Sequence, residues 1–222
     1  EQPPDADSVQ TWPLDVERGV IKPPWGGELA FNATGSAPFL GCMGTAPPES
    51  LGAVVSSVAP HATFGGNLDL KLLAAPSTLR LPINRAGALF SAGDGHALQG
   101  DGEVGLTAAE ANVRATLRLT VEKGGSPLRS PRAETPERLI ALGMAPGSLD
   151  DALSAATENL VSWLAELRPT LARDALVRLT SVAADAAVTQ AVNGGVKGVH
   201  VSIAKAALPP LPSAEASVHD DL

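Results

Sequence analysis

One short stretch of this chain gathers most of the side chains that can do chemistry. Gly93–Glu103 reads GDGHALQGDGE, which places three carboxylates, one imidazole and one amide among four glycines. Carboxylates and imidazoles bind divalent metals and move protons, and glycine lets the backbone turn sharply and approach a ligand. The combination predicts part of a reaction site.

Metal-assisted hydrolysis is the chemistry that this stretch supports best. Asp94, His96 and Asp101 offer ligands for a cation that polarises an attacking water, and Glu103 or another carboxylate can take the proton of that water. The spacing is not that of an EF-hand loop, and no H-E-x-x-H pair occurs. A glycine-rich hairpin with solvated acids is the structural alternative.

Three further candidates are weaker when each is judged by itself. In Gly65–Asp69, two glycines precede Asn67 and Asp69, and a tight turn capped by these side chains explains the pattern better than a ligand site does. His200 lies in a predicted strand, where a half-buried histidine is the commoner outcome. Cys42 lacks an identifiable neighbouring base, so it is better explained as a buried thiol than as a nucleophile.

Short strands are expected to position the candidate site. Between residues 51 and 122 apolar pieces are broken by Gly, Pro and Asn, and Thr78–Ile83 and Ala88–Ser91 are two of the predicted strands. Val113–Val121 is the clearest, because apolar and polar residues alternate along it.

The pattern becomes helical after residue 147. Ser148 begins a capping-box start, apolar residues from Leu149 to Leu167 follow at helical spacing, and Pro169 ends that helix. Thr170 is expected to cap a second helix, whose apolar face runs to Val182, and 199–203 returns to strand alternation. Strands followed by helices predict an α+β fold: a β-rich core, sandwich-like or barrel-like, with a C-terminal helical pair and a returning strand.

Composition narrows the classes of function. With 222 residues, 44% of them hydrophobic and 18% charged, the chain has the balance of a globular protein. The net charge of −8 and the lack of a Lys/Arg cluster argue against a nucleic-acid partner. No apolar run is long enough to cross a bilayer, so no membrane partner is expected. The single cysteine suits a reducing compartment, which predicts a cytoplasmic protein.

Several motifs, taken in order, resemble the acetamidase/formamidase family of metal-associated short-chain amide hydrolases. The similarity extends from about Trp12 to Lys205, and its motifs are long and specific. They are Pro38–Pro48, the GGN-x-D element Gly65–Asp69, Gly87–Ser91 leading into Gly93–Glu103, and Thr189–Asn193 followed by Lys197–His200, with the helical 148–183 region fitting as well.

The resemblance implies hydrolysis of a small amide, of formamide or acetamide type, to a carboxylate and ammonia, by a homo-oligomer. A divalent metal is expected, zinc first, with calcium, manganese or iron also compatible with Asp, His and Glu ligands. The predicted metal ligands are Asp69 and His96, with Asp94 and Asp101 as alternates. The predicted general base is Glu103, the residues positioning the amide or the water are Asn67 and Gln99, and the substrate-binding residues are His200 and Gly66.

The family's chains carry a further β-rich segment ahead of the position equivalent to Trp12. We therefore expect a mobile lead-in over residues 1–12, a catalytic region lacking that segment over 13–207, and a Pro-rich polar tail over 208–222. The alternative function is a truncated, catalytically silent homologue that serves as an assembly or binding subunit. A third possibility is a metal-dependent hydrolase acting on a related amide or a cyclic ureide.

Overall fold

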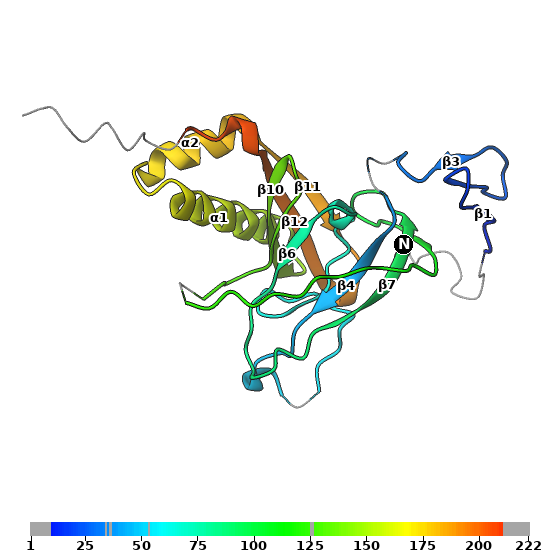
Figure 1. Cartoon of the computed structure of the whole chain (residues 1–222), viewed down its shortest axis with the longest axis horizontal. Coiled ribbons are helices and arrows are strands. Elements are labelled where there is room, and N and C mark those ends of the chain that lie inside the picture. Colours follow the sequence, from blue (N-terminus) through cyan, green and yellow to red (C-terminus); the bar gives the residue numbers. More distant parts are fainter. Residues whose placement is uncertain (1–9, 34, 36, 53, 125–126, 211–222) are drawn as a thin grey trace, which may run out of the picture.

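The computed structural model has three antiparallel sheets and two helices, so the α+β prediction is confirmed (Figure 1). It describes residues 10–210 except 34, 36, 53, 125 and 126. Most of the predicted lead-in, residues 1–9, and most of the predicted tail, residues 211–222, lie outside the described residues.

The elements follow one another in chain order. The strands are β1 (Leu14–Asp15), β2 (Val20–Ile21), β3 (Leu29–Ala30), β4 (Phe39–Gly44), β5 (Gly65–Asn67), β6 (Thr78–Arg80), β7 (Ser91–Leu98), β8 (Ala109–Glu110), β9 (Arg132–Glu134), β10 (Arg138–Pro146), β11 (Ala184–Gln190) and β12 (Val196–Ala204). The α-helices are α1 (Leu149–Leu167) and α2 (Arg173–Ala183), and the 3-10 turns are η1 (Glu49–Leu51), η2 (Lys71–Leu73), η3 (Asn193–Gly195) and η4 (Lys205–Ala207).

The largest sheet has the strand order β11-β12-β10-β9-β6, and the second has the order β5-β4-β7-β8. A small third sheet, β1-β2-β3, extends to one side of the molecule (Figure 1). It is attached through Ile21, which is fully buried in a cluster with Ala97 and Leu98 at the end of β7. The strand that carries the chemical motif is thus covered at its end by the N-terminal part of the chain.

Strand β10 divides the molecule into two hydrophobic cores because its side chains alternate between the two faces of the sheet. Leu139 and Ala141 pack with the helices in one cluster. Ile140 and Leu142 pack with Leu68, Leu70 and Met43 in the other. The result is a helical layer, a central sheet, and a second layer containing β4 and β7 (Figure 1).

Helix α1 begins and ends where the sequence predicts. The Ser148 side chain accepts a hydrogen bond from the Asp151 backbone N–H at 3.1 Å, and the helix stops at Leu167, two residues before Pro169. The predicted start of α2 is wrong: its N-cap is Ala172, which makes no side-chain cap bond, and Thr170 lies in the preceding turn. Val182 is 82% exposed, so it is not part of the buried face of α2.

Two of the predicted strands are wrong. Val113–Val121 is not a strand, and Leu117 and Leu119 are 47% and 65% exposed. Alternation indicates that a segment suits a sheet, but a strand also needs a neighbour with which to exchange backbone hydrogen bonds. Ala88 and Leu89 have φ values of 55° and 48°, so the strand predicted over Ala88–Ser91 begins only at its last residue.

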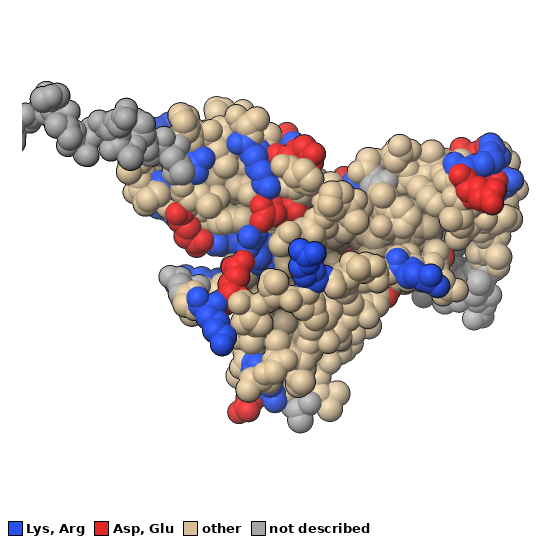
Figure 2. Space-filling model, viewed as in Figure 1, with Lys and Arg blue, Asp and Glu red and all other residues tan. Residues whose placement is uncertain are grey.

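Charged side chains are scattered over the face of the molecule drawn in Figure 2. On the face drawn in Figure 2, Lys and Arg side chains lie singly or beside Asp and Glu and form no continuous basic patch. Among the described residues, neither α-helix is long and apolar enough to cross a membrane.

Candidate metal centre

The motif Gly93–Glu103 is the second part of strand β7 followed by a turn. Asp94 and His96 lie on β7, two residues apart, so both side chains point to the same face of the sheet. Gln99 and Glu103 follow in the turn after β7. A parallel bridge between Gly102 and Gln190 places this turn against the end of β11.

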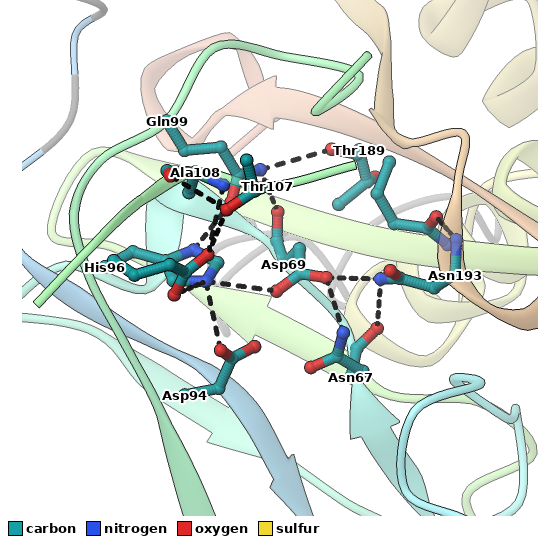
Figure 3. A network of polar contacts seen from close by, with 11 residues as sticks. Asn67, Asp69, Asp94, His96, Gln99, Thr107, Ala108, Thr189 and Asn193 are labelled. Atoms are coloured by element: carbon teal, nitrogen blue, oxygen red, sulfur yellow. Dashed lines mark hydrogen bonds and ion pairs between the residues drawn. The ribbon is translucent and has the colours of Figure 1, made fainter. Parts of the chain in front are cut away.

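Asp69 lies at the centre of the site and is fully buried. Its backbone N–H donates to the Gly41 carbonyl oxygen at 3.0 Å, which fixes the segment after β5 beside β4. Its Oδ2 accepts hydrogen bonds from the side-chain amide of Asn67, at 2.9 Å, and from that of Asn193 (Figure 3). Two amides thus hold one carboxylate oxygen, while Oδ1 points toward His96 and Asp94.

Gln99 determines which nitrogen of His96 faces the acids. The Gln99 Nε2 group donates to the Asp69 carbonyl oxygen at 2.7 Å, so its Oε1 faces His96 Nδ1 at 2.9 Å and requires a proton there. Nε2 is left as the nitrogen available to a ligand. It lies 3.2 Å from Asp94 Oδ1, 3.2 Å from Glu110 Oε2 and 4.0 Å from Asp69 Oδ1 (Figure 3).

The pocket holds more negative charge than its own groups can neutralise. Burial, and then the charge of Asp69, raises the pKa of Glu103 to about 8. Burial also raises the pKa of Asp69. Burial alone would lower the pKa of His96, but the hydrogen bond to Glu110 and the charges of Glu110, Asp94 and Asp69 outweigh it and raise that pKa to about 9. Bound protons or a bound cation therefore stabilise this arrangement.

Two buried carboxylate oxygens identify where a cation fits. Asp69 Oδ1 and Glu103 Oε2 have no hydrogen-bond partner within the described part of the chain, and a native protein rarely leaves buried polar atoms unpaired. One ligand atom each from Asp69, His96 and Glu103 lie within 4.8 Å of one another, and Asp94, His96 and Glu110 form a second such group. Oxygen and imidazole donors suit zinc and other divalent metals.

Gly41 leaves the space that such a cation needs. A Cβ atom at this position would lie 2.3 Å from Asp69 Oδ1, 2.7 Å from Asp94 Oδ2 and 3.0 Å from His96 Cε1. The absence of a side chain on β4 thus lets three functional groups of the site converge. The residues present fit a divalent cation.

Backbone strain is concentrated in the same place. Among the described residues, six that are not glycine have a positive φ, and three of them are Asp69, Asp94 and Glu103, with φ values of 47°, 64° and 44°. Such conformations cost free energy and persist where surrounding structure enforces them, often at functional sites.

The structure brings most of the predicted site residues together. Asn67, Asp69, Asp94, His96, Gln99 and Glu103 form one connected cluster. Asp101 belongs to neither group of possible metal ligands. Its carboxylate pairs instead with Lys71 Nζ at 2.9 Å. Gly66 lies on β5, and a Cβ atom added to it would lie 3.2 Å from the Ser57 carbonyl oxygen and 3.4 Å from that of Ala59.

His200 lies in the interior of the central sheet. It is buried on β12, and its Nδ1 lies 2.9 Å from Thr189 Oγ1. Burial lowers its pKa to about 4, so it is neutral at neutral pH. The substrate-binding role of His200 stays a prediction.

Glu110 and Asn193 are site residues that the sequence reasoning missed. Glu110 lies opposite His96 in the pairing of β7 with β8, a register that cannot be read from spacing along the chain. Asn193 belongs to the motif Thr189–Asn193, but only the fold shows that its amide reaches Asp69. Its place within that motif was the only feature of the sequence that could have indicated a site role for Asn193.

Two cavities adjoin the cluster, and Asp94 lies on the wall of both. One, of about 410 Å³, is lined by Asp94, Gly95, Glu110, Ala111 and Asn112. The other, of about 390 Å³, is lined by Cys42, Ser57, Val58, Asn67, Ser91, Ala92, Gly93 and Asp94.

The model of the Acetamidase/Formamidase family matches residues 28–193. The chain belongs to the acetamidase/formamidase family. This match covers every residue of the acid cluster, including Glu110 and Asn193, and it confirms the family predicted from the motifs.

Solved structures with the same fold support this assignment. The acetamidase from Bacillus halodurans is 28% identical with a TM-score of 0.68, over 87% of this chain and 60% of its own. A predicted acetamidase/formamidase from the thermophile Thermoanaerobacter tengcongensis is 26% identical with a TM-score of 0.68, over 84% of this chain and 57% of its own.

An acetamidase from Yersinia enterocolitica is similar in fold, with a TM-score of 0.73 at 23% identity, over 90% of this chain and 56% of its own. This acetamidase/formamidase family member therefore spans between 56% and 60% of the length of these three structures. No curated protein sequence matches it.

Proposed function

We propose that this chain hydrolyses a small amide to a carboxylate and ammonia at the cluster around Asp69, His96 and Glu103. The observation that carries the proposal is the pair of buried carboxylate oxygens, Asp69 Oδ1 and Glu103 Oε2, that lack a hydrogen-bond partner among the described residues. Asp69 Oδ1 also faces the space left by Gly41. Family membership supports amide hydrolysis as the reaction.

A divalent cation, zinc first, would be held by Asp69, Glu103 and His96 Nε2. When bound, it supplies a Lewis acid and lowers the pKa of a bound water. Gln99 keeps the His96 proton on Nδ1, and Asn67 and Asn193 hold the Asp69 carboxylate in one orientation. Such supporting hydrogen bonds orient metal ligands in proteins.

We propose Glu110 as the general base and Glu103 as a ligand. Glu103 is only 6% exposed, and its carboxyl lies against that of Asp69, which suits a group that stays in place. The Glu110 side chain is 50% exposed, its Oε1 is held by Thr107 Oγ1 at 3.0 Å and by the Ala108 N–H at 3.1 Å, and its Oε2 faces His96. A base must be both ionised and accessible. In the metal-free protein the hydrogen bond to His96 lowers the pKa of Glu110, and the hydrogen bonds from Thr107 and Ala108, which do not involve His96 Nε2, lower it as well.

We place the amide in the cavity lined by Asp94, Glu110 and Asn112, whose remaining lining residues are Gly95 and Ala111. These side chains are short and mostly polar, and they offer no deep apolar pocket for a long acyl group. Formamide and acetamide are therefore the substrates that suit the cavity best.

The proposal is tested by metal analysis of the purified protein, followed by chelation, readdition of zinc and an assay for ammonia release from formamide and acetamide. We expect about one zinc per chain and activity that is lost and regained with the metal. His96→Ala that retains full activity would exclude this site. A protein that binds zinc tightly but releases no ammonia from any amide would favour the assembly or binding subunit.

We also propose that the protein is a cytoplasmic homo-oligomer. The single cysteine, Cys42, supports a reducing compartment. Light scattering after size-exclusion chromatography measures the oligomeric state, and a monomer at every concentration would refute that part of the proposal.

A further inference from the structure

An ion pair links the two chain segments that present the buried acids. Lys71 Nζ lies 2.9 Å from Asp101 Oδ2, and the Lys71 side chain is only 11% exposed. Lys71 follows Asp69 by two residues, and Asp101 precedes Glu103 by two residues. The pair therefore bridges the Asp69 segment and the turn that carries Glu103.

The turn carries a carboxylate with one buried oxygen that no hydrogen bond from the described residues orients, so the position of Glu103 depends on how the turn is held. Glu103 Oε2 has no hydrogen-bond partner among the described residues. The backbone of Gly102 is tied to the end of β11, where its N–H donates to Thr189 at 3.3 Å and its carbonyl accepts from Ala191 at 2.9 Å. These bonds fix the turn relative to β11, and the Asn193 amide just after β11 holds Asp69, which is an indirect link between the turn and Asp69. A direct link between the two segments would act beside this indirect one.

Apart from the approach of the two acids to each other, two side-chain contacts join the turn directly to the Asp69 segment within the described chain. One is the Gln99 amide on the Asp69 carbonyl oxygen, at the start of the turn. The other is Lys71 with Asp101, near its end. We propose that Lys71 and Asp101 are positioning residues that set the separation of the Asp69 and Glu103 carboxylates, and thereby the affinity for the cation; this rests on the proposed function.

A positioning role and a purely electrostatic role predict opposite changes in cation affinity when the lysine is removed. If the pair acted only through its charges, removing the lysine charge would tighten cation binding and removing the aspartate charge would weaken it. If the pair is a brace, either loss lets the turn move, and both variants bind the cation more weakly. The double variant then resembles each single variant, because the same contact is lost in all three.

The probe is zinc, titrated against a competing chelator. We expect Lys71→Met and Asp101→Asn each to weaken zinc binding by about 10-fold or more, as loss of residues supporting metal ligands does, with the double variant no weaker than about twofold beyond either. Lys71→Arg is expected to rescue most of the affinity. Tighter binding by Lys71→Met, or unchanged binding by both single variants, would overturn the proposal.

Lys205→Met is the matched control, because Lys205 Nζ also lies 2.9 Å from a carboxylate, that of Glu134, in an ion pair away from the site. It removes the same charge and is expected to leave zinc binding unchanged. An equal loss of zinc affinity in this control would show that breaking an ion pair elsewhere in the fold has the same effect, and would overturn the proposal.

Hydrogen exchange on metal-free protein separates failure of the brace from failure of the proposed function. We expect Lys71→Met to speed exchange of the Gly102 and Glu103 amides, with the β10 amides and the global unfolding midpoint little changed. If wild type binds no zinc, the proposed function fails while this measurement still tests the brace. Unchanged exchange in the turn would overturn the brace even in a protein that binds zinc.

Discussion

Gly41→Ala is the substitution that tests the candidate site most directly, because it adds one carbon atom at the point where the ligands converge. The added Cβ would lie 2.3 Å from Asp69 Oδ1, whereas real Cβ atoms essentially never come closer than 3.0 Å to another heavy atom. Either the carboxylate or the β4 backbone must move by about 0.7 Å or more, on the gap between those two distances.

A displacement of this size is larger than a metal site tolerates. Ligand distances in metal sites fall within roughly 0.2 Å of their ordinary values, so a shift of about 0.7 Å removes Asp69 as a ligand or expels the cation. We expect zinc affinity to fall by at least about 100-fold, which corresponds to ~2.7 kcal/mol. Amide hydrolysis should fall with it.

Zinc competition titration and ammonia release measure the two effects. Overpacking a well-packed site costs ~1–3 kcal/mol of stability, so intrinsic tryptophan fluorescence, to which the buried Trp163 contributes, is followed in urea to show that the variant is folded. Gly93→Ala is the control: it lies on the neighbouring strand β7, and its added Cβ would meet nothing within 4 Å. Zinc binding by Gly41→Ala within about threefold of wild type would show that the space left by Gly41 is not needed for the cation.

Three further predictions concern the pH dependence, the two glutamates and the fold. In the metal-free protein, the folded-state pKa values of Glu103 and His96, about 8 and about 9, exceed the ordinary values of 4.5 and 6.5, so the folded state binds more protons. Burial lowers the folded-state pKa of His200 to about 4, which offsets this effect below about pH 6.5. Urea unfolding should therefore show stability falling as pH rises from about 6.5 to about 9, with added zinc removing much of the fall; a stability that rises over this window would contradict the charge balance. Glu103→Gln should lose zinc and activity together, whereas Glu110→Gln should keep zinc and lose about 10²–10⁴-fold in kcat; the reverse pattern would return Glu103 to the role of base. Gly143→Ala should destabilise the fold by ~3 kcal/mol, because its Cβ would lie 2.1 Å from the Ala152 carbonyl oxygen of α1, and an unchanged urea midpoint would show that the helix can move away.

Local chemistry in the sequence predicted a large part of the molecule. The Ser148 cap, the spacing of apolar residues and Pro169 define α1, since each acts within a few residues along the chain. The acids and the histidine of Gly93–Glu103 indicated a candidate site for the same reason. The family's motifs raised Asn67 and Asp69 from a turn to site residues, and the structure places both in the cluster.

Features that depend on a partner distant in the sequence could not be predicted in this way. Val113–Val121 has the alternation of a strand, but the described residues offer it no neighbouring strand. Asp101 has the chemistry of a ligand, but Lys71 engages it. Glu110 reaches His96 only because β7 and β8 pair in one register.

The sequence by itself thus determined which groups are available, the family and the α1 helix, because residue type and local spacing carry that information. The tertiary structure decided which carboxylates share one pocket: Asp69 and Glu103 in the interior, Asp94 and Glu110 at its opening, and Asp101 outside the cluster. The physical reason is that strand register and burial, which set distances and pKa values, arise from contacts between segments far apart in the chain.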